Sequence, residues 1–209
     1  MKIIVTGASG FIGSHLTKIM RENNIDAIGV SRKIGPYVNK LLDTYEDIIN
    51  YKDIDIVVHL ADLNVNNNYV NKNFFDIYSL SSYFSKKIIY VSSGLIYGEH
   101  SNDLLIEKSL VNPVTSYAKN KFQNENIVLS NNGTVLRLSN VYGKRMSKNN
   151  VFYDIFKQVK LNKNIIKLKK INHIRDFIAV EDVCTAIVNV VLNQKKGIYN
   201  ISSGKGTSI

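Results

Sequence analysis

Short apolar runs alternate with amphipathic segments along most of this 209-residue chain. The run KIIVTG at 2–7 is rich in β-branched residues and ends at a glycine, and the apolar residues of 11–23 then recur at the spacing of one helix face. Strands without polar interruptions are typical of parallel sheets that are covered on both faces. The alternation therefore predicts an α/β fold that is built on a doubly wound parallel sheet.

Further elements follow in the same order. Strands are predicted at 2–7, 26–30, 54–62, 87–93 and 134–140, and helices at 11–23, 44–53, 74–85, 116–132, 150–161 and 180–193. Neither an internal repeat nor a flexible linker interrupts the series, so we do not expect a second domain that folds separately. The sequence stops at GKGTSI, which is typical of the start of another element. We therefore expect a truncated or unusually short chain.

Composition limits the class of protein. Hydrophobic residues make up 44% and charged residues 21%, which is ordinary for a globular protein. No apolar run approaches the ~20 residues of a membrane span, and the N-terminus lacks a secretory signal, so we expect a cytoplasmic protein without a membrane partner. The single cysteine, Cys184, excludes an internal disulfide and is expected to pack in the core. The histidines do not stand at ligand spacing, so no metal is expected.

The net charge of +10 raises the question of nucleic-acid binding. The lysines are scattered, however, and the densest basic stretch, at 160–170, alternates charged with apolar residues. This pattern favours a solvated face, with attraction of anionic substrates as the next interpretation and duplex binding as the last. We expect no nucleic-acid partner.

A glycine triad joins the first predicted strand to the first predicted helix. Gly7, Gly10 and Gly13 are spaced three apart in TGASGFIG. Glycine lets the backbone turn sharply and approach a pyrophosphate, while the helix presents free N–H groups and a positive dipole end. In this strand–loop–helix context the triad favours dinucleotide binding over a plain tight turn. We expect residues 1–143 to form the dinucleotide-binding domain, and 144–209 a substrate-side segment interleaved with it.

The end of the second predicted strand indicates which dinucleotide binds. A cofactor without a 2′-phosphate usually meets an acidic residue there, whereas this sequence has Ser31 and Arg32. A hydroxyl and a guanidinium suit a 2′-phosphate, which favours NADP, with NAD as the alternative. Arg32 and Lys33 as ordinary exposed loop charges remain the other interpretation.

Tyr117 precedes Lys121 by four positions in the predicted helix 116–132, so both side chains share one face. The ammonium favours the phenolate, which would otherwise form only near pH 10. The strand 87–93 ends at Ser92 and Ser93, on the edge where open α/β sheets bind ligands. A serine, a phenol and an ammonium near a nicotinamide would form a proton-transfer site, although an ordinary surface pair has the same spacing.

Seven segments resemble, in order, the extended branch of the short-chain dehydrogenase/reductase superfamily, in particular its NAD(P)-dependent sugar-nucleotide epimerases, dehydratases and reductases. They are TGASGFIG, HLAD at 59–62, VSSGLIYG at 91–98, NPVTSYAKNKFQNE at 112–125, LRLSNVYG at 136–143, RDFIAVEDVCTAI at 175–187 and YNISSGKGTSI at 199–209. One such segment is modest support, whereas seven in register are specific. The resemblance implies a Rossmann fold and a nucleotide-sugar substrate.

The resemblance implies that Ser93, Tyr117 and Lys121 are catalytic. Tyr117 would act as general base in alcohol oxidation and general acid in ketone reduction, its pKa lowered by Lys121 and the oxidised nicotinamide, while Ser93 orients the substrate oxygen. The implied substrate contacts are Ser93, Asn140 and Arg175. The implied cofactor contacts are Gly7, Ser9, Gly10, Phe11, Ile12, Gly13, Ser31, Arg32, Asp43, Leu60, Ala61, Tyr117 and Lys121. Asp43 could equally cap the following helix, and Arg175 could pair locally with Asp176.

Departures from the family pattern separate its members. Dehydratases place an Asp-Glu pair after the catalytic threonine, where this sequence has Gly94 and Leu95. Epimerases mostly carry an acid at the second strand, which is also missing. A reductase of a keto-deoxysugar therefore fits best, with a 4-epimerase that retains NAD and a non-catalytic NADP-binding regulatory or scaffold protein as alternatives. The resemblance further implies a homodimer through the Tyr117 helix and a role in surface polysaccharide synthesis.

Overall fold

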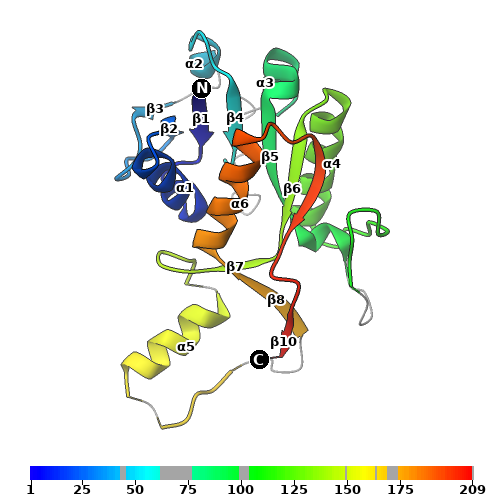
Figure 1. Cartoon of the computed structure of the whole chain (residues 1–209). Coiled ribbons are helices and arrows are strands. Elements are labelled where there is room, and N and C mark those ends of the chain that lie inside the picture. The colour runs from blue at the N-terminus through cyan, green and yellow to red at the C-terminus, as the bar shows by residue number, and fades with distance from the viewer. Residues whose placement is uncertain are drawn as a thin grey trace.

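The computed structural model describes residues 1–42, 46–61, 77–98, 104–148, 150–162, 164–168 and 174–208. Its main sheet has seven strands in the order β3-β2-β1-β4-β5-β6-β9, and all neighbouring strands are parallel (Figure 1). These strands are β1 Lys2–Thr6, β2 Asp26–Ser31, β3 Lys40–Leu41, β4 Ile56–His59, β5 Ile88–Ser93, β6 Thr134–Leu138 and β9 Gly197–Ile201. The doubly wound parallel sheet is thus confirmed.

A smaller sheet lies beyond the carboxyl ends of the main strands (Figure 1). It consists of β10 Gly206–Ser208, β8 Ile174–Ala179 and β7 Asn140–Tyr142, with β7 and β8 parallel and β10 and β8 antiparallel. The helices are α1 Phe11–Glu22, α2 Glu46–Ile49, α3 Ile77–Phe84, α4 Ser116–Ser130, α5 Val151–Lys160 and α6 Val180–Leu192, with short 3-10 turns η1 Ser85–Lys87 and η2 Gly94–Tyr97.

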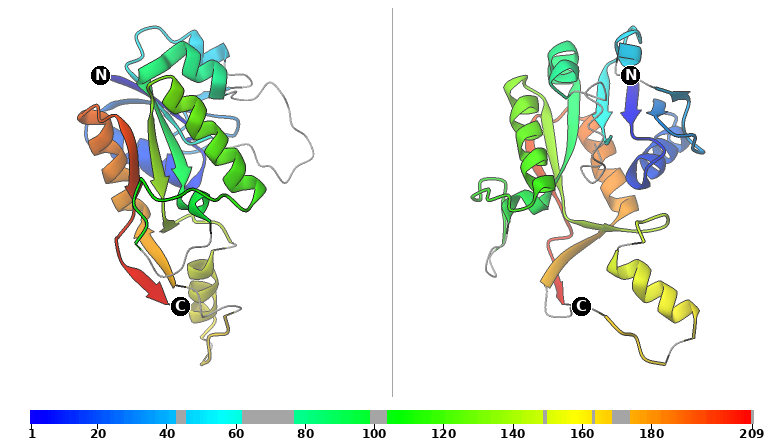
Figure 2. Two further views of the ribbon diagram at one scale, coloured as in Figure 1. Left: turned by 90° about the vertical axis from the view of Figure 1, so that its right-hand side faces the viewer. Right: turned by 180° about the vertical axis from the view of Figure 1, so that it is seen from behind.

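Helices cover both faces of the main sheet (Figure 2). Side chains of a strand alternate between faces, so Ile3 and Val5 pack with α1 and α6, whereas Ile4 packs with α3 and α4. Cys184 is fully buried on the α1/α6 face, where it was expected. Both faces of the strands are therefore shielded from solvent, which explains the continuous apolar runs of the sequence.

One helix boundary and several strands differ from the sequence-based expectation. The helix predicted at 44–53 ends at Ile49, and the chain turns again at Asp53, whose φ is +61°. The strands β3, β7, β8, β9 and β10 were not predicted. β9 is only half-buried and has no strictly apolar run, so it is defined by its pairing with β6.

The strand order places a ligand crevice at the carboxyl ends of β1 and β4. The chain moves outward from β1 through β2 to β3 and then returns to the other side of β1 at β4. At such a reversal the two crossover connections diverge and leave a crevice. The loops that follow β1, β4, β5 and β6 carry the predicted site residues. Within the described residues, no helix is long and apolar enough to cross a membrane.

Candidate active site

The glycine loop between β1 and α1 is packed too closely for side chains. Gly7 has φ +69°, and a Cβ there would lie 3.0 Å from the backbone nitrogen of Ala61. A Cβ on Gly13 would lie 2.2 Å from the carbonyl oxygen of Gly7, which accepts a hydrogen bond of 2.8 Å from the Gly10 N–H. The N-terminus of α1 therefore lies directly behind the loop, as a cradle for a dinucleotide pyrophosphate requires.

The end of β2 is connected to this loop through two hydroxyl groups. The Oγ atoms of Ser9 and Ser31 are 2.6 Å apart, and the Lys33 N–H donates to Ser31 Oγ over 3.4 Å. Ser31 is buried, whereas Arg32 is exposed. The structure thus brings Ser9, Ser31 and Arg32 to the same edge. Asp43, predicted to contact the adenine, lies outside the described residues.

Thr6 determines the geometry where β1 and β4 end. Its Oγ1 accepts hydrogen bonds of 3.1 Å from the backbone N–H groups of Leu60 and Ala61. The Thr6 hydroxyl therefore donates its own hydrogen to His59 Nδ1, 3.0 Å away, which leaves the ring proton on Nε2. Burial lowers the pKa of His59 to about 3, with the positive charge of Lys121 as the second cause. His59 is thus a neutral core residue below the loop.

The N-terminus of α4 sets the position of Tyr117. Thr115 caps the helix, since its Oγ1 accepts a hydrogen bond of 3.1 Å from the Ala118 N–H. Tyr117 therefore falls in the first turn, where it remains 39% exposed. One turn later Lys121 is only 3% exposed. The two residues of the pair thus differ: Tyr117 is partly exposed and Lys121 is buried.

The Lys121 ammonium lies between α4 and β5. Its Nζ donates to the Val91 carbonyl over 2.8 Å and lies 4.8 Å from the centre of the Tyr90 ring. The centre of the Tyr117 ring is 5.8 Å from the same Nζ. A buried ammonium at this distance favours the charged form of a phenol. The buried Lys121 ammonium therefore stabilises the phenolate form more than the lysine of an exposed i,i+4 pair would.

Ser93 stands at the carboxyl end of β5, where the strand turns into η2. Its Oγ accepts a hydrogen bond of 3.2 Å from the Leu95 N–H, which fixes the side chain at the beginning of the turn. The neighbouring Ser92 is buried, and its hydroxyl has no hydrogen-bond partner among the described residues. The half-buried Ser93 is thus the one of the two serines that is accessible from the site edge.

Of the three predicted substrate residues, Asn140 and Arg175 lie on the smaller sheet. Asn140 Nδ2 donates to the Asp176 carbonyl over 3.1 Å, and the exposed Arg175 stands next to it on β8. Asp176, which the sequence analysis did not assign, accepts from Ser139 Oγ at 2.9 Å. Its carboxylate also accepts from the backbone N–H groups of Ser203 and Lys205. Asp176 thus connects the ends of β6 and β9 to β8.

Arg145 was also missed, although it approaches the glycine loop. The residue has φ +72°, and its Nη2 lies 3.5 Å from the Ser9 carbonyl oxygen. The carbonyl oxygen of Lys144, the residue before Arg145, lies 2.8 Å from Nε2 of His15 on α1. Both contacts join residues more than 100 positions apart in the sequence, so no local pattern indicated them.

These features together describe a Rossmann-type α/β protein with polar side chains gathered at the carboxyl edge of its sheet. The chain belongs to the NAD dependent epimerase/dehydratase family, whose family model matches residues 3–202. The family predicted from the seven sequence segments is confirmed.

Individual relatives agree with this assignment. A protein of Methanocaldococcus jannaschii named putative UDP-glucose 4-epimerase is 34% identical over 99% of this chain and 78% of its own length. A GDP-6-deoxy-D-talose 4-dehydrogenase of Aggregatibacter actinomycetemcomitans is 28% identical over 100% of this chain and 76% of its own length. The crystal structure of UDP-N-acetylglucosamine 4-epimerase from Bacillus cereus superposes with a TM-score of 0.84 at 26% identity, covering all of this chain and 78% of that one.

Proposed function

We propose that the protein is an NAD(P)-dependent oxidoreductase of nucleotide-activated sugars that reduces a keto-deoxysugar, with Ser93, Tyr117 and Lys121 as its catalytic residues. The observation that carries this proposal is the buried Lys121 ammonium, 2.8 Å from the Val91 carbonyl and 5.8 Å from the Tyr117 ring centre. A binding protein gains nothing from burying a charge next to a phenol, because the desolvation of that charge is costly.

A dinucleotide held by the glycine loop between β1 and α1 would supply the hydride from its nicotinamide ring. Tyr117 donates its phenolic proton to the carbonyl oxygen of the substrate as that oxygen becomes an alcohol. Lys121 stabilises the phenolate that remains, and Ser93 donates a hydrogen bond to the same oxygen. In the reverse direction Tyr117 accepts the proton. Asn140 and Arg175 lie on the smaller sheet, from which we propose that they contact the nucleotide sugar.

We propose NADP as the preferred cofactor. The supporting observation is the basic edge at the end of β2, where buried Ser31 contacts Ser9 and Arg32 is exposed. Their hydroxyl and guanidinium donors suit a 2′-phosphate. A structure of Bacillus cereus UDP-glucuronic acid 4-epimerase, 26% identical to this chain, is described in complex with NAD, which supports NAD as the alternative.

A 4-epimerase with retained NAD is the second candidate. Both the Methanocaldococcus relative and the Bacillus cereus structure bear the names of 4-epimerases. Ser93, Tyr117 and Lys121 would serve either reaction, because epimerisation is an oxidation followed by a reduction at one carbon. The basic end of β2 favours the reductase over the epimerase only through its proposed preference for NADP over NAD. A non-catalytic NADP-binding protein is the remaining alternative.

We further propose that residues 1–143 form the cofactor domain, that 144–209 complete it on the substrate side, and that two copies dimerise through α3 and α4. Tyr78 and Tyr83 on α3 are more than half exposed, which supports the proposed dimer face. Synthesis of surface polysaccharides is the proposed setting. Sedimentation equilibrium at several concentrations tests the dimer.

Separate titrations with NADPH and NADH, followed by nicotinamide fluorescence, test the cofactor. We expect tighter binding of NADPH and a loss of about tenfold in NADPH affinity in Arg32→Ala, since a charge-assisted hydrogen bond contributes about 1.5–3 kcal/mol. NADH binding in the same variant is the control. Equal affinity for the two cofactors would contradict the NADP assignment and favour the epimerase. Oxidation of NADPH with a panel of nucleotide 4-keto-6-deoxysugars then tests the reductase directly, and conversion of UDP-hexoses without added cofactor tests the epimerase.

A further inference from the structure

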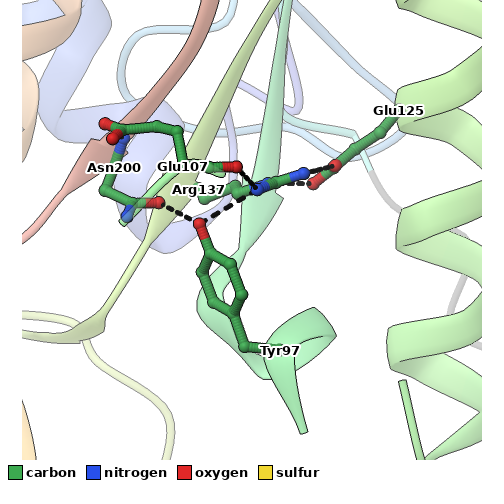
Figure 3. Close-up of polar contacts among 5 residues, drawn as sticks. All are labelled: Tyr97, Glu107, Glu125, Arg137 and Asn200. Atoms are coloured by element: carbon green, nitrogen blue, oxygen red, sulfur yellow. Dashed lines mark hydrogen bonds and ion pairs between the residues drawn. The ribbon is translucent and has the colours of Figure 1, made fainter. Parts of the chain in front are cut away.

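A buried arginine lies under the proposed site, on the face of the sheet that α4 covers. Arg137, on β6, is 4% exposed, and its guanidinium contacts three groups that come from three segments (Figure 3). Nη2 and Nε donate to Glu125 Oε2 at 2.8 and 3.1 Å, and Nη1 donates to the Tyr97 hydroxyl at 2.9 Å and to the Glu107 carbonyl at 3.1 Å.

The Arg137–Glu125 ion pair is fully removed from water. Glu125 is 0% exposed, and the two side chains meet in a bidentate geometry. A buried ion pair contributes little net stability compared with apolar side chains of similar size, because both charges lose their hydration. Stability alone therefore does not explain the placement of these two charges in the core.

The same network reaches the segment that carries Ser93. Tyr97 ends the η2 turn that follows Ser93, and its hydroxyl accepts from Arg137 and donates to Asn200 Oδ1 over 2.7 Å (Figure 3). Glu107 Oε1 accepts from the Asn200 N–H at 2.8 Å, and this bond is the first cause that lowers the pKa of Glu107. One guanidinium thus connects η2, the 104–115 segment, β9 and α4.

On α4, Glu125 continues the line of Tyr117 and Lys121. The three residues are spaced four apart, so they follow one another along one face of the helix. Among these, Lys121 and Glu125 are both buried and carry opposite charges at neighbouring turns. The Glu125 carboxylate is directed to Arg137, and the Lys121 ammonium is directed to Val91 and the tyrosine rings.

We propose that Arg137 is a positioning residue: by holding the Glu125 carboxylate, it keeps the Lys121 ammonium available to Tyr117. The proposal rests on the proposed function of Tyr117 and Lys121 and adds two residues with defined electrostatic roles. Without Arg137, the uncompensated Glu125 carboxylate would attract Lys121 along the helix and weaken its effect on the phenol. Without Glu125, the Arg137 guanidinium would add an uncompensated positive charge.

Several groups of the described residues face Lys121 and Arg137 from the neighbouring elements. Lys121 is faced by His59 and Tyr90 from the sheet, and Arg137 is faced by Tyr97 and Glu107. His59 stays neutral because burial lowers its pKa to about 3. The α3 segment that packs against α4, IYSLSSYF, carries no charged side chain.

The test is the ionisation midpoint of Tyr117, measured by NMR on protein with ¹³C-labelled tyrosine. The Tyr117 resonance is assigned by its loss in Tyr117→Phe. We expect Arg137→Met to raise the midpoint by about one unit and Glu125→Gln to lower it, with the double variant returning toward the wild-type value. Shifts of opposite sign distinguish a charge effect from a packing defect, which would move both single variants in the same direction. This measurement needs no turnover, so it is independent of whether the sugar substrate is correct.

Two further variants control the interpretation. Arg137→Lys keeps the charge and loses the bidentate geometry, so we expect a midpoint near the wild-type value together with a lower Tm. Arg21→Met removes an arginine of α1 that contacts Tyr37, away from α4, and should leave the Tyr117 midpoint unchanged. An unshifted midpoint in Arg137→Met, or a raised one in Glu125→Gln, would overturn the proposal. If Arg137→Met does not fold, the sign of the Glu125→Gln shift decides alone.

Discussion

Alanine in place of Gly13 tests the glycine cradle at its tightest contact. The new Cβ would lie 2.2 Å from the Gly7 carbonyl oxygen and 2.8 Å from the Gly7 carbonyl carbon. Both atoms belong to the backbone, so no change of side-chain rotamer can relieve the overlap. The same oxygen accepts the hydrogen bond from the Gly10 N–H, so α1 and the loop must move apart at the point where a pyrophosphate would bind.

The expected change in the free energy of unfolding is the sum of destabilising and stabilising contributions. Overpacking costs about 1–3 kcal/mol, and loss of the Gly10–Gly7 hydrogen bond costs about 1 kcal/mol. The higher helix propensity of alanine compared with glycine offsets up to about 1 kcal/mol of this cost. We therefore expect a decrease of roughly 2 kcal/mol in the free energy of unfolding, which corresponds to a Tm lower by about 4–8 °C for a chain of this size. Dinucleotide affinity should fall by more than about tenfold, because the displaced loop no longer presents its N–H groups.

The assays are thermal unfolding followed by circular dichroism and titration with NADPH followed by fluorescence. Asn189→Ala, at an exposed position in α6, is a matched control that changes helix propensity without a backbone overlap. We expect this control to raise Tm slightly and to bind cofactor normally. An unchanged or higher Tm in Gly13→Ala, with normal cofactor affinity, would refute the reasoning that the loop is closed around Gly13.

Three further predictions concern single side chains. Ser93→Ala should lower kcat by about 100-fold or more, while the adjacent Ser92→Ala, which removes a buried hydroxyl with no partner among the described residues, should leave kcat and Tm nearly unchanged in the same assays. Burial lowers the pKa of His59 in the folded state to about 3 from the ordinary value of 6.5, so the unfolded state binds more protons between these values. Stability should therefore fall as pH decreases below 6.5, by roughly 2 kcal/mol at pH 5, and urea titrations of His59→Asn should show a flatter dependence on pH. Burial raises the pKa of Cys184 to about 12, so a thiol reagent at pH 8 should modify it only upon unfolding, and rapid modification of native protein would contradict its burial.

Local patterns predicted the main sheet because its strands are buried on both faces. The runs that form β1, β4, β5 and β6 are mostly apolar, so their identity does not depend on any particular neighbour. The strands β8 and β9 lack this signal, since most of their residues are half-buried. Their pairing with β7 and β6 is decided by contacts between distant parts of the chain, which no window of sequence contains.

Some features of the proposed site likewise follow from the local sequence, and others depend on tertiary contacts. The sequence by itself determined the glycine loop, the order of the elements and the four-residue spacing of Tyr117, Lys121 and Glu125, because each depends only on neighbouring residues. Only the tertiary structure decided that Lys121 is buried against Val91 and that Arg137 neutralises Glu125. Burial and charge pairing arise when separate segments pack together. The spacing of residues predicts which side chains share a helix face, and the fold decides which of those side chains are buried away from solvent.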